Sequence, residues 1–169
     1  MYAIQWPKGF VPGFVDNFAS NEMIVAGLSV ADIWPLLSQP HEWPGYYDNA
    51  AEVRIHDGGG PELQLGDSFH FKTFGFQVEC KVVECVEAHQ GEPARIAWYG
   101  ESGEGDDRLE VHHAWLIENL DADRVRILTQ ETQNGNPAKE LAISKPNEMI
   151  DGHQNWINGL VATAKSRKS

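Results

Sequence analysis

The chain has 169 residues, enough for one domain with a substantial core, and a formal net charge of −12. This charge argues against binding to nucleic acid or to an anionic membrane surface, because both require clusters of lysine and arginine. No apolar run in the sequence is long enough to cross a bilayer. We therefore expect no nucleic acid and no membrane among its partners.

Residues 1–20 are rich in aromatic residues and proline but show neither a helical nor a strand period. They contain no basic segment and no small-residue cleavage site, so we expect no signal peptide and a cytoplasmic protein. We interpret 1–20 as an aromatic N-terminal arm and 21–169 as a single domain. The arm either packs across its own domain or joins a partner chain, which would give a homodimer. We favour the first, because so large an exposed aromatic patch promotes aggregation.

A strand-like segment over 22–28 leads into two short helices. Ser29 suits a helix N-cap, and Asp32, three residues later, can complete a capping box. Pro35 limits this first helix, because its ring removes a backbone donor and crowds the preceding turn. A second short helical turn, bracketed by prolines and rich in aromatic residues, follows over 40–47.

Alternation of apolar and polar residues predicts six further strands, separated by loops that contain glycine or aspartate. The predicted ranges are 51–56, 68–74, 76–86, 95–100, 109–119 and 124–133. Sequential hairpins of this kind build an antiparallel sheet. Cys80 and Cys85 lie in one predicted strand at an odd spacing, so we expect them on opposite faces and both thiols free, as in a reducing cytosol.

The C-terminal region is helical. Asn136 and Pro137 open a short helix, and Pro146 begins a longer one that extends to about residue 165. Apolar residues recur at helical spacing along the longer helix and must be buried against the sheet. We interpret Gly152 and Gly159 within it as marks of close approach to the sheet.

Short motifs along the chain follow the element order of a known superfamily. They are Ala31, Ile33-Trp34, Leu36-Leu37, Trp43-Pro44, Leu65 to Asp67, Pro93 to Trp98 and Trp115-Leu116. On these residues the chain resembles the SRPBCC superfamily, also called START-like or Bet v 1-like, whose bacterial members are often labelled polyketide cyclase/dehydrase. The resemblance covers roughly residues 20 to 165.

The resemblance implies an α+β helix-grip fold. A curved antiparallel sheet of about seven strands wraps around a long C-terminal helix, with two short helices after the first strand. It also implies an internal cavity between sheet and helix that holds an apolar or aromatic small molecule. By alternation and helical spacing, the candidate ligand-binding residues are Phe69, Phe71, Trp98, Trp115, Met149, His153 and Trp156. Walls and core are chemically alike, so some of these belong simply to the core.

His113 and Glu131 are the candidate catalytic residues. Neighbours in a strand point to opposite faces, so His112 and His113 cannot share a metal, and His113 takes the apolar inner face. A three-residue turn at 121–123 pairs His113 with Glu131, and an imidazole and a carboxylate in contact could transfer protons. A register shifted by one step would instead place Thr129 opposite His113. The alternatives are a satisfied core histidine and a glutamate that reaches solvent at the rim of the sheet.

Three functions are compatible with these observations. The protein binds an apolar or aromatic small molecule, which we favour, or it is a polyketide cyclase/dehydratase-type enzyme, or it is an interaction or stress-related module without turnover. The sequence shows no catalytic motif, so enzyme activity stays open. It has no Cys or His spacing typical of a metal site and no phosphate-binding loop, so we expect no metal and no cofactor.

Overall fold

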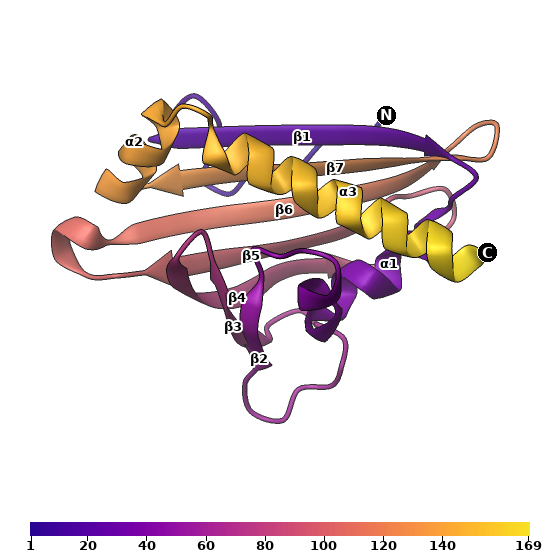
Figure 1. The fold of residues 1–169 in the computed structure, drawn as a ribbon, viewed down its shortest axis with the longest axis horizontal. Coiled ribbons are helices and arrows are strands. Elements are labelled where there is room, and N and C mark those ends of the chain that lie inside the picture. The colour runs from indigo at the N-terminus through magenta and orange to yellow at the C-terminus, as the bar shows by residue number, and fades with distance from the viewer.

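The computed structural model describes residues 1–169 and contains one antiparallel sheet with a long helix across it (Figure 1). The strands are β1 (Asn17–Ala26), β2 (Ala51–Ile55), β3 (Ser68–Thr73), β4 (Phe76–Val86), β5 (Ala94–Ser102), β6 (Leu109–Leu120) and β7 (Arg124–Asn134). Their order in the sheet is β1-β7-β6-β5-β4-β3-β2. The helical elements are α1 (Val30–Ser38), η1 (Pro40–Gly45), η2 (Gly105–Asp107), α2 (Asn136–Ile143) and α3 (Glu148–Lys168). The predicted helix-grip fold is confirmed.

Several element boundaries differ from the predictions by a few residues, and those of β1 and α1 have a clear cause. β1 begins at Asn17, five residues before the predicted start, because Asn17 and Asn21 pair with β7 while their inward polar side chains hide the alternating pattern. Pro35 lies inside α1 and does not end it. Pro35 removes a single helical hydrogen bond, and the burial of Leu36 and Leu37 keeps the chain helical to Ser38.

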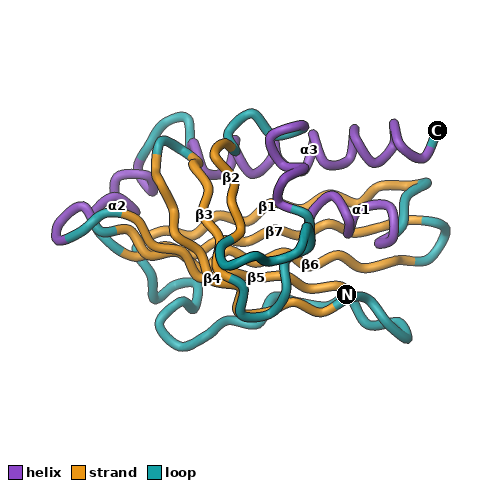
Figure 2. The backbone as a smooth tube through the Cα atoms, turned by 90° about the horizontal axis from the view of Figure 1, so that it is seen from below, coloured by secondary structure: helices purple, strands orange, loops and turns teal.

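The main core lies between the sheet and α3, which Figure 2 shows on one side of the strands, with the N-terminal end of the chain on the other. Large aromatic side chains from the strands, from η1 and from α3 fill this core. They are Trp43, Phe69, Phe71, Trp98, Trp115 and Trp156. Trp156 of α3 is 1% exposed and stacks on Tyr47, with ring centres 4.4 Å apart. The aromatic residues expected to surround a cavity therefore pack largely against one another.

The two cysteines are free thiols, as predicted, but not for the predicted reason. The register between β4 and β5 shifts between Val82 and Glu84, so one extra residue interrupts the alternation. Cys80 and Cys85 consequently both face the main core, where Cys85 Sγ donates to the Leu63 carbonyl oxygen at 3.3 Å. The expectation of opposite faces was wrong, because a bulge reverses the parity of every later residue.

The first residues of the chain contact the outer face of their own sheet. Ile4 packs with Ala114 and Leu128 in a small apolar cluster, and the Trp6 ring lies edge-on to His112, 5.5 Å between centres. This contact buries His112, which a bare outer sheet face would leave exposed. No helix of the protein is both long and apolar enough to cross a membrane.

The buried His112 predicts a stability loss in mild acid. Burial, and secondarily the neighbouring His113, lowers the pKa of His112 to about 4. Between pH 6.5 and about 4, His112 is protonated in the unfolded chain but neutral in the folded protein. The free energy of unfolding therefore falls as the pH falls through this range. At pH 5 the loss from this residue is about 2 kcal/mol. Urea unfolding at pH 7 and pH 5 should show a smaller loss for His112→Phe than for the wild type. Equal losses would contradict the prediction.

Candidate functional site

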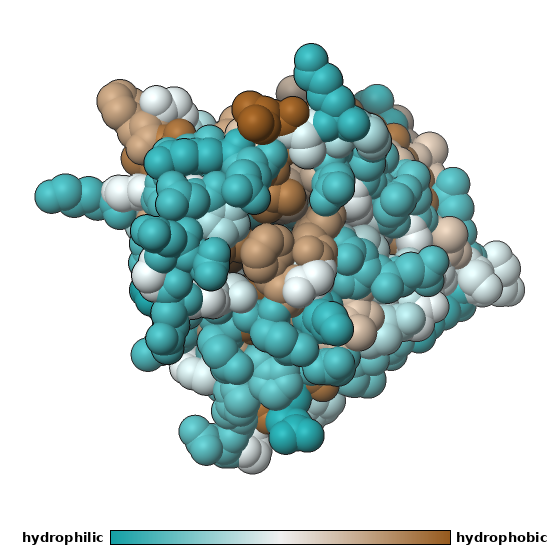
Figure 3. Space-filling view, turned by 60° about the vertical axis from the view of Figure 1, so that its left-hand side comes forward, coloured by the Kyte–Doolittle hydropathy of each residue, from teal (hydrophilic) through white to brown (hydrophobic).

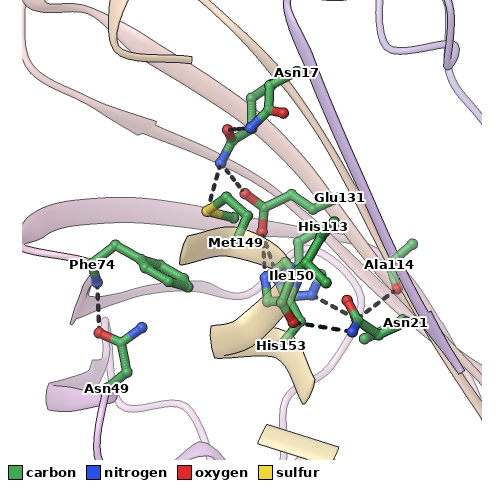
Figure 4. Close-up of polar contacts among 12 residues, drawn as sticks. Asn17, Asn21, Asn49, Phe74, His113, Ala114, Glu131, Met149, Ile150 and His153 are labelled. Carbon is green, nitrogen blue, oxygen red and sulfur yellow. Dashed lines mark hydrogen bonds and ion pairs between the residues drawn. The ribbon is translucent and has the colours of Figure 1, made fainter. Parts of the chain in front are cut away.

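Three ionisable side chains from three elements meet beneath α3, and we call them the His–Glu–His cluster: His113 of β6, Glu131 of β7 and His153 of α3. The Nδ1 atom of His113 lies 3.0 Å from Oε2 of Glu131, and Nε2 of His153 lies 3.4 Å from the same oxygen. All three residues are buried. The predicted pairing of His113 with Glu131 is confirmed by the β6–β7 register, and Figure 4 shows the helix bringing His153 to the pair.

Neighbouring polar groups fix the orientation of the cluster. The Thr129 hydroxyl lies 3.4 Å from the Ala114 carbonyl oxygen, to which it donates, and 2.8 Å from Nε2 of His113, from which it can therefore accept. This assigns the ring proton of a neutral His113 to Nε2. The other oxygen of Glu131 accepts from Nε2 of Gln133, whose own oxygen accepts from Asn17 at 2.7 Å.

Glu131 is held as a carboxylate. Burial alone would oppose its ionisation, but the charge and hydrogen bonds that His113 and His153 supply when protonated outweigh this, and the pKa of Glu131 lies well below its usual range. Burial in turn lowers the pKa of His113. A carboxylate in an apolar interior needs such partners. The site therefore combines an ionised acceptor with two imidazole rings whose nitrogens face it.

A small cavity adjoins the cluster. Its volume is about 20 Å³, and its walls include Phe71, Val78, Trp98, Trp156 and the three cluster residues. That volume is of the order needed for one water molecule, while drug-sized ligands need roughly 300–1,000 Å³. The interior thus has no room for an aromatic ligand unless a side chain moves.

Phe74 is a wall between this cavity and a much larger groove outside. The groove measures about 760 Å³ and lies between the η1–β2 loop, the β3–β4 turn and the first half of α3. Phe74 contributes to the lining of both spaces. Figure 3 shows apolar residues in a hollow at this end of the molecule, surrounded by hydrophilic ones.

The position of Phe74 is set by its surroundings. Its φ is +50°, in the left-handed region, and its N–H donates to Oδ1 of Asn49 at 2.8 Å. Its ring lies edge-on to His153, 6.0 Å between centres, and fits over Gly152, where a Cβ would come within 2.4 Å of Cζ. In Figure 4 the ring points from the β3–β4 turn toward the cluster. Phe74 is the one residue that lines both the groove and the cavity beside the His–Glu–His cluster.

The predicted site residues divide into two groups. Phe71, Trp98, His113, Glu131, His153 and Trp156 line the cavity. Phe69, Trp115 and Met149 are buried but do not line it. A ligand-binding or catalytic role for any of them stays a prediction.

Sequence reasoning missed Phe74 and Gln133. Gln133 could have been found, because it continues the inward stripe of Thr129 and Glu131. The only signal for Phe74 was its place before Gly75 in a predicted turn.

Comparison with known proteins gives one similar protein of undescribed function and a shared fold. No protein-family model and no curated protein matches the chain. A hypothetical protein from Helicobacter pylori of known crystal structure is 47% identical, with 97% of each chain covered and a TM-score of 0.92. A norcoclaurine synthase from Thalictrum flavum is 16% identical, with 90% of this chain and 96% of that chain covered and a TM-score of 0.61. The chain therefore belongs to one family with the Helicobacter pylori protein, and it shares the Bet v 1-like, or SRPBCC, helix-grip fold with norcoclaurine synthase.

A further structure with this fold is an ARO/CYC protein. The di-domain ARO/CYC protein of the BE-7585A biosynthetic pathway is 12% identical, with a TM-score of 0.58, and the alignment covers 90% of this chain and 46% of that one. Identities this low show the shared fold alone. The Helicobacter pylori relative, which is far closer, is described only as hypothetical, so activity has to be argued from the site.

Proposed function

We propose that this protein binds a small molecule whose apolar or aromatic body lies in the groove and whose polar group reaches the His–Glu–His cluster behind Phe74. The observation that carries the proposal is the shared wall: one partly buried phenylalanine separates a groove of about 760 Å³ from three buried ionisable side chains. The cavity behind Phe74 is mostly apolar with a few convergent polar groups, as is typical of ligand sites, while the groove has a mainly polar lining with aromatic surface from Tyr46, Tyr47 and Phe74.

The groove itself limits the chemistry of the ligand. Tyr46, Tyr47 and Phe74 offer aromatic surface, and Tyr47 is fixed by its stacking on Trp156. The groove lining also includes three carboxylates, those of Asp48, Glu148 and Asp151, and no lysine or arginine. Like charges repel, so a neutral or cationic aromatic compound is favoured over an anionic one.

Phe74→Ala is expected to increase the affinity for an apolar fluorescent dye several-fold, because the variant opens the interior to the groove. Dye fluorescence titration, with competition by small aromatic compounds, measures this. Phe18→Ala is a matched control, since Phe18 is also a partly exposed phenylalanine but lines neither space. If the wild type and Phe74→Ala both bind no dye, or if Phe18→Ala gives the same increase, the proposal fails.

A cyclase- or dehydratase-type enzyme is the second candidate. It is favoured by the 3.0 Å contact between His113 and Glu131 and by the bond from His113 to Thr129, which orients the imidazole as a general base requires. With a substrate identified, His113→Asn or Glu131→Gln should remove turnover and leave dye binding largely intact. Retained turnover in both variants would exclude the pair as the acid/base group.

Two further predictions accompany the proposal. A cytoplasmic location is supported by the two free thiols. A homodimer through the N-terminal arm would have to use side chains that the arm leaves exposed, among them Phe14 at 87% exposure.

A further inference from the structure

We infer that the His–Glu–His cluster is a binding site for a divalent transition-metal ion of the zinc type, with His113, Glu131 and His153 as its three protein ligands. This inference deepens the proposed function, since the ion would meet the polar group of the ligand, but it concerns the cluster alone. It also departs from our sequence-based expectation of no metal, which rested on local spacing. The three residues are far apart in sequence and converge only through the β6–β7 register and the position of α3.

The distances fit coordination. One nitrogen of each histidine and one oxygen of Glu131 all lie within 4.8 Å of one another. Zinc binds such atoms at about 2.0–2.2 Å. Two ligand atoms at that bond length and 3.0 or 3.4 Å apart, the distances from Oε2 to the two nitrogens, subtend roughly 90–110° at the ion. These angles are those of tetrahedral or octahedral ligand pairs. The two histidine nitrogens lie within 4.8 Å of each other, so binding also requires them to come within about 4 Å, the largest separation that two such bonds can span.

The hydrogen bonds around the cluster leave Nδ1 of His113 available to bind an ion. Thr129 assigns the His113 proton to Nε2, so a neutral His113 turns the lone pair of Nδ1 toward the carboxylate. Two electron-rich atoms 3.0 Å apart in a buried site need a positive charge between them, supplied either by an added proton or by a cation. In the metal-free protein the Glu131 carboxylate, 3.4 Å away, favours a proton on Nε2 of His153. An ion in that place would move the ring proton to Nδ1, which is buried and makes no hydrogen bond, and Nε2 would then present its lone pair.

The cluster also has hydrogen-bond partners that hold its ligand residues in place, and space beside it for a further ligand. Metal sites hold their ligands through second hydrogen bonds of the kind that Thr129 makes to His113 and Gln133 makes to Glu131. Sites with two histidines and one carboxylate keep a further position for water or substrate. The adjoining cavity of about 20 Å³ has room for one water molecule, and it lies on the Phe74 side, from which a ligand would enter.

The composition of the cluster selects the class of ion. Imidazole nitrogens suit zinc and its transition-metal neighbours, while calcium and magnesium prefer all-oxygen sites. With neutral histidines the cluster carries one negative charge, so a divalent ion leaves a single positive charge in the buried site. A single positive charge would attract a ligand oxygen and polarise a carbonyl or a bound water.

Metal titration of the full-length protein tests the inference. The chelator-stripped wild type, without dye or ligand, is titrated with Zn²⁺ by calorimetry and with Co²⁺ by visible absorption. We expect one tight site per chain, Co²⁺ bands typical of nitrogen–oxygen coordination, and a higher unfolding temperature with Zn²⁺. His153→Ala should weaken binding by more than roughly a hundredfold, and Thr129→Val by about tenfold, because outer-shell partners alone are worth about 10–100-fold.

The protein carries its own control in a second cluster of two histidines and a glutamate. His56, His70 and Glu79 lie together on the sheet, with the Glu79 side chain 64% exposed. The double variant His56→Ala/His70→Ala should leave the tight site unchanged. The inference is overturned if the stripped wild type has no tight site, or if the double variant removes it while His153→Ala retains it. Dye binding to the metal-free protein is measured separately, so failure of the ion site and failure of ligand binding give different results.

Discussion

Replacing Trp156 by alanine is expected to lower the free energy of unfolding by about 3–5 kcal/mol. The indole is 1% exposed and contacts aromatic rings on every side, among them Trp43 at 5.1 Å and Trp115 at 5.2 Å between ring centres. Its removal leaves a large cavity where the sheet, η1 and α3 meet, and packed aromatic neighbours can close such a space only in part. Urea unfolding gives the change directly, and the melting temperature should fall by about 6–20 °C.

Ile150 supplies the control for this measurement. It lies on the same helix but is 42% exposed, so Ile150→Ala should cost less than about 1 kcal/mol. A loss below about 1 kcal/mol for Trp156→Ala would mean that α3 does not present this face to the sheet. In that event the position of His153, three residues earlier on the same face, would also be wrong.

The pairing of His113 with Glu131 was predictable, because the length of a hairpin turn fixes which residues of its two strands lie opposite each other. The turn at 121–123 has the left-handed residues Ala122 and Asp123, and once it was counted as three residues it fixed His113 opposite Glu131. The fold was predictable for a similar reason. Hairpins follow one another along the chain, and the apolar stripe of α3 has only one sheet to cover.

Other features depend on contacts that no local pattern encodes. The bulge in β4 adds one residue without a distinctive sequence, and it reversed the expected face of Cys85. His153 reaches Glu131 only because α3 crosses β7 at this point. The small size of the cavity results from how six aromatic side chains pack together, and residue types alone cannot distinguish a wall from a core.

Gly159→Ala is expected to destabilise the protein by about 1–3 kcal/mol or more, although alanine normally favours a helix over glycine by about 1 kcal/mol. A Cβ at this position would lie 1.9 Å from the Tyr46 carbonyl oxygen, which is backbone. We expected the helix glycines to mark close approach to the sheet, but α3 instead passes against the chain that follows η1. Relief requires movement of α3 or of that segment, and the loss is measured by urea unfolding.

Gly45 and Gly152 serve as comparison positions for the effect of Gly159→Ala. Gly45 has open space around its would-be Cβ, so Gly45→Ala should be close to neutral. Gly152→Ala meets only the ring of Phe74, a side chain that can rotate away, so it should cost less than Gly159→Ala. By displacing that ring, Gly152→Ala should also raise dye affinity as Phe74→Ala does, while Gly159→Ala should not. If Gly152→Ala and Gly159→Ala were equally destabilising and neither changed dye binding, Phe74 would be a fixed part of the core and not the movable wall of the site.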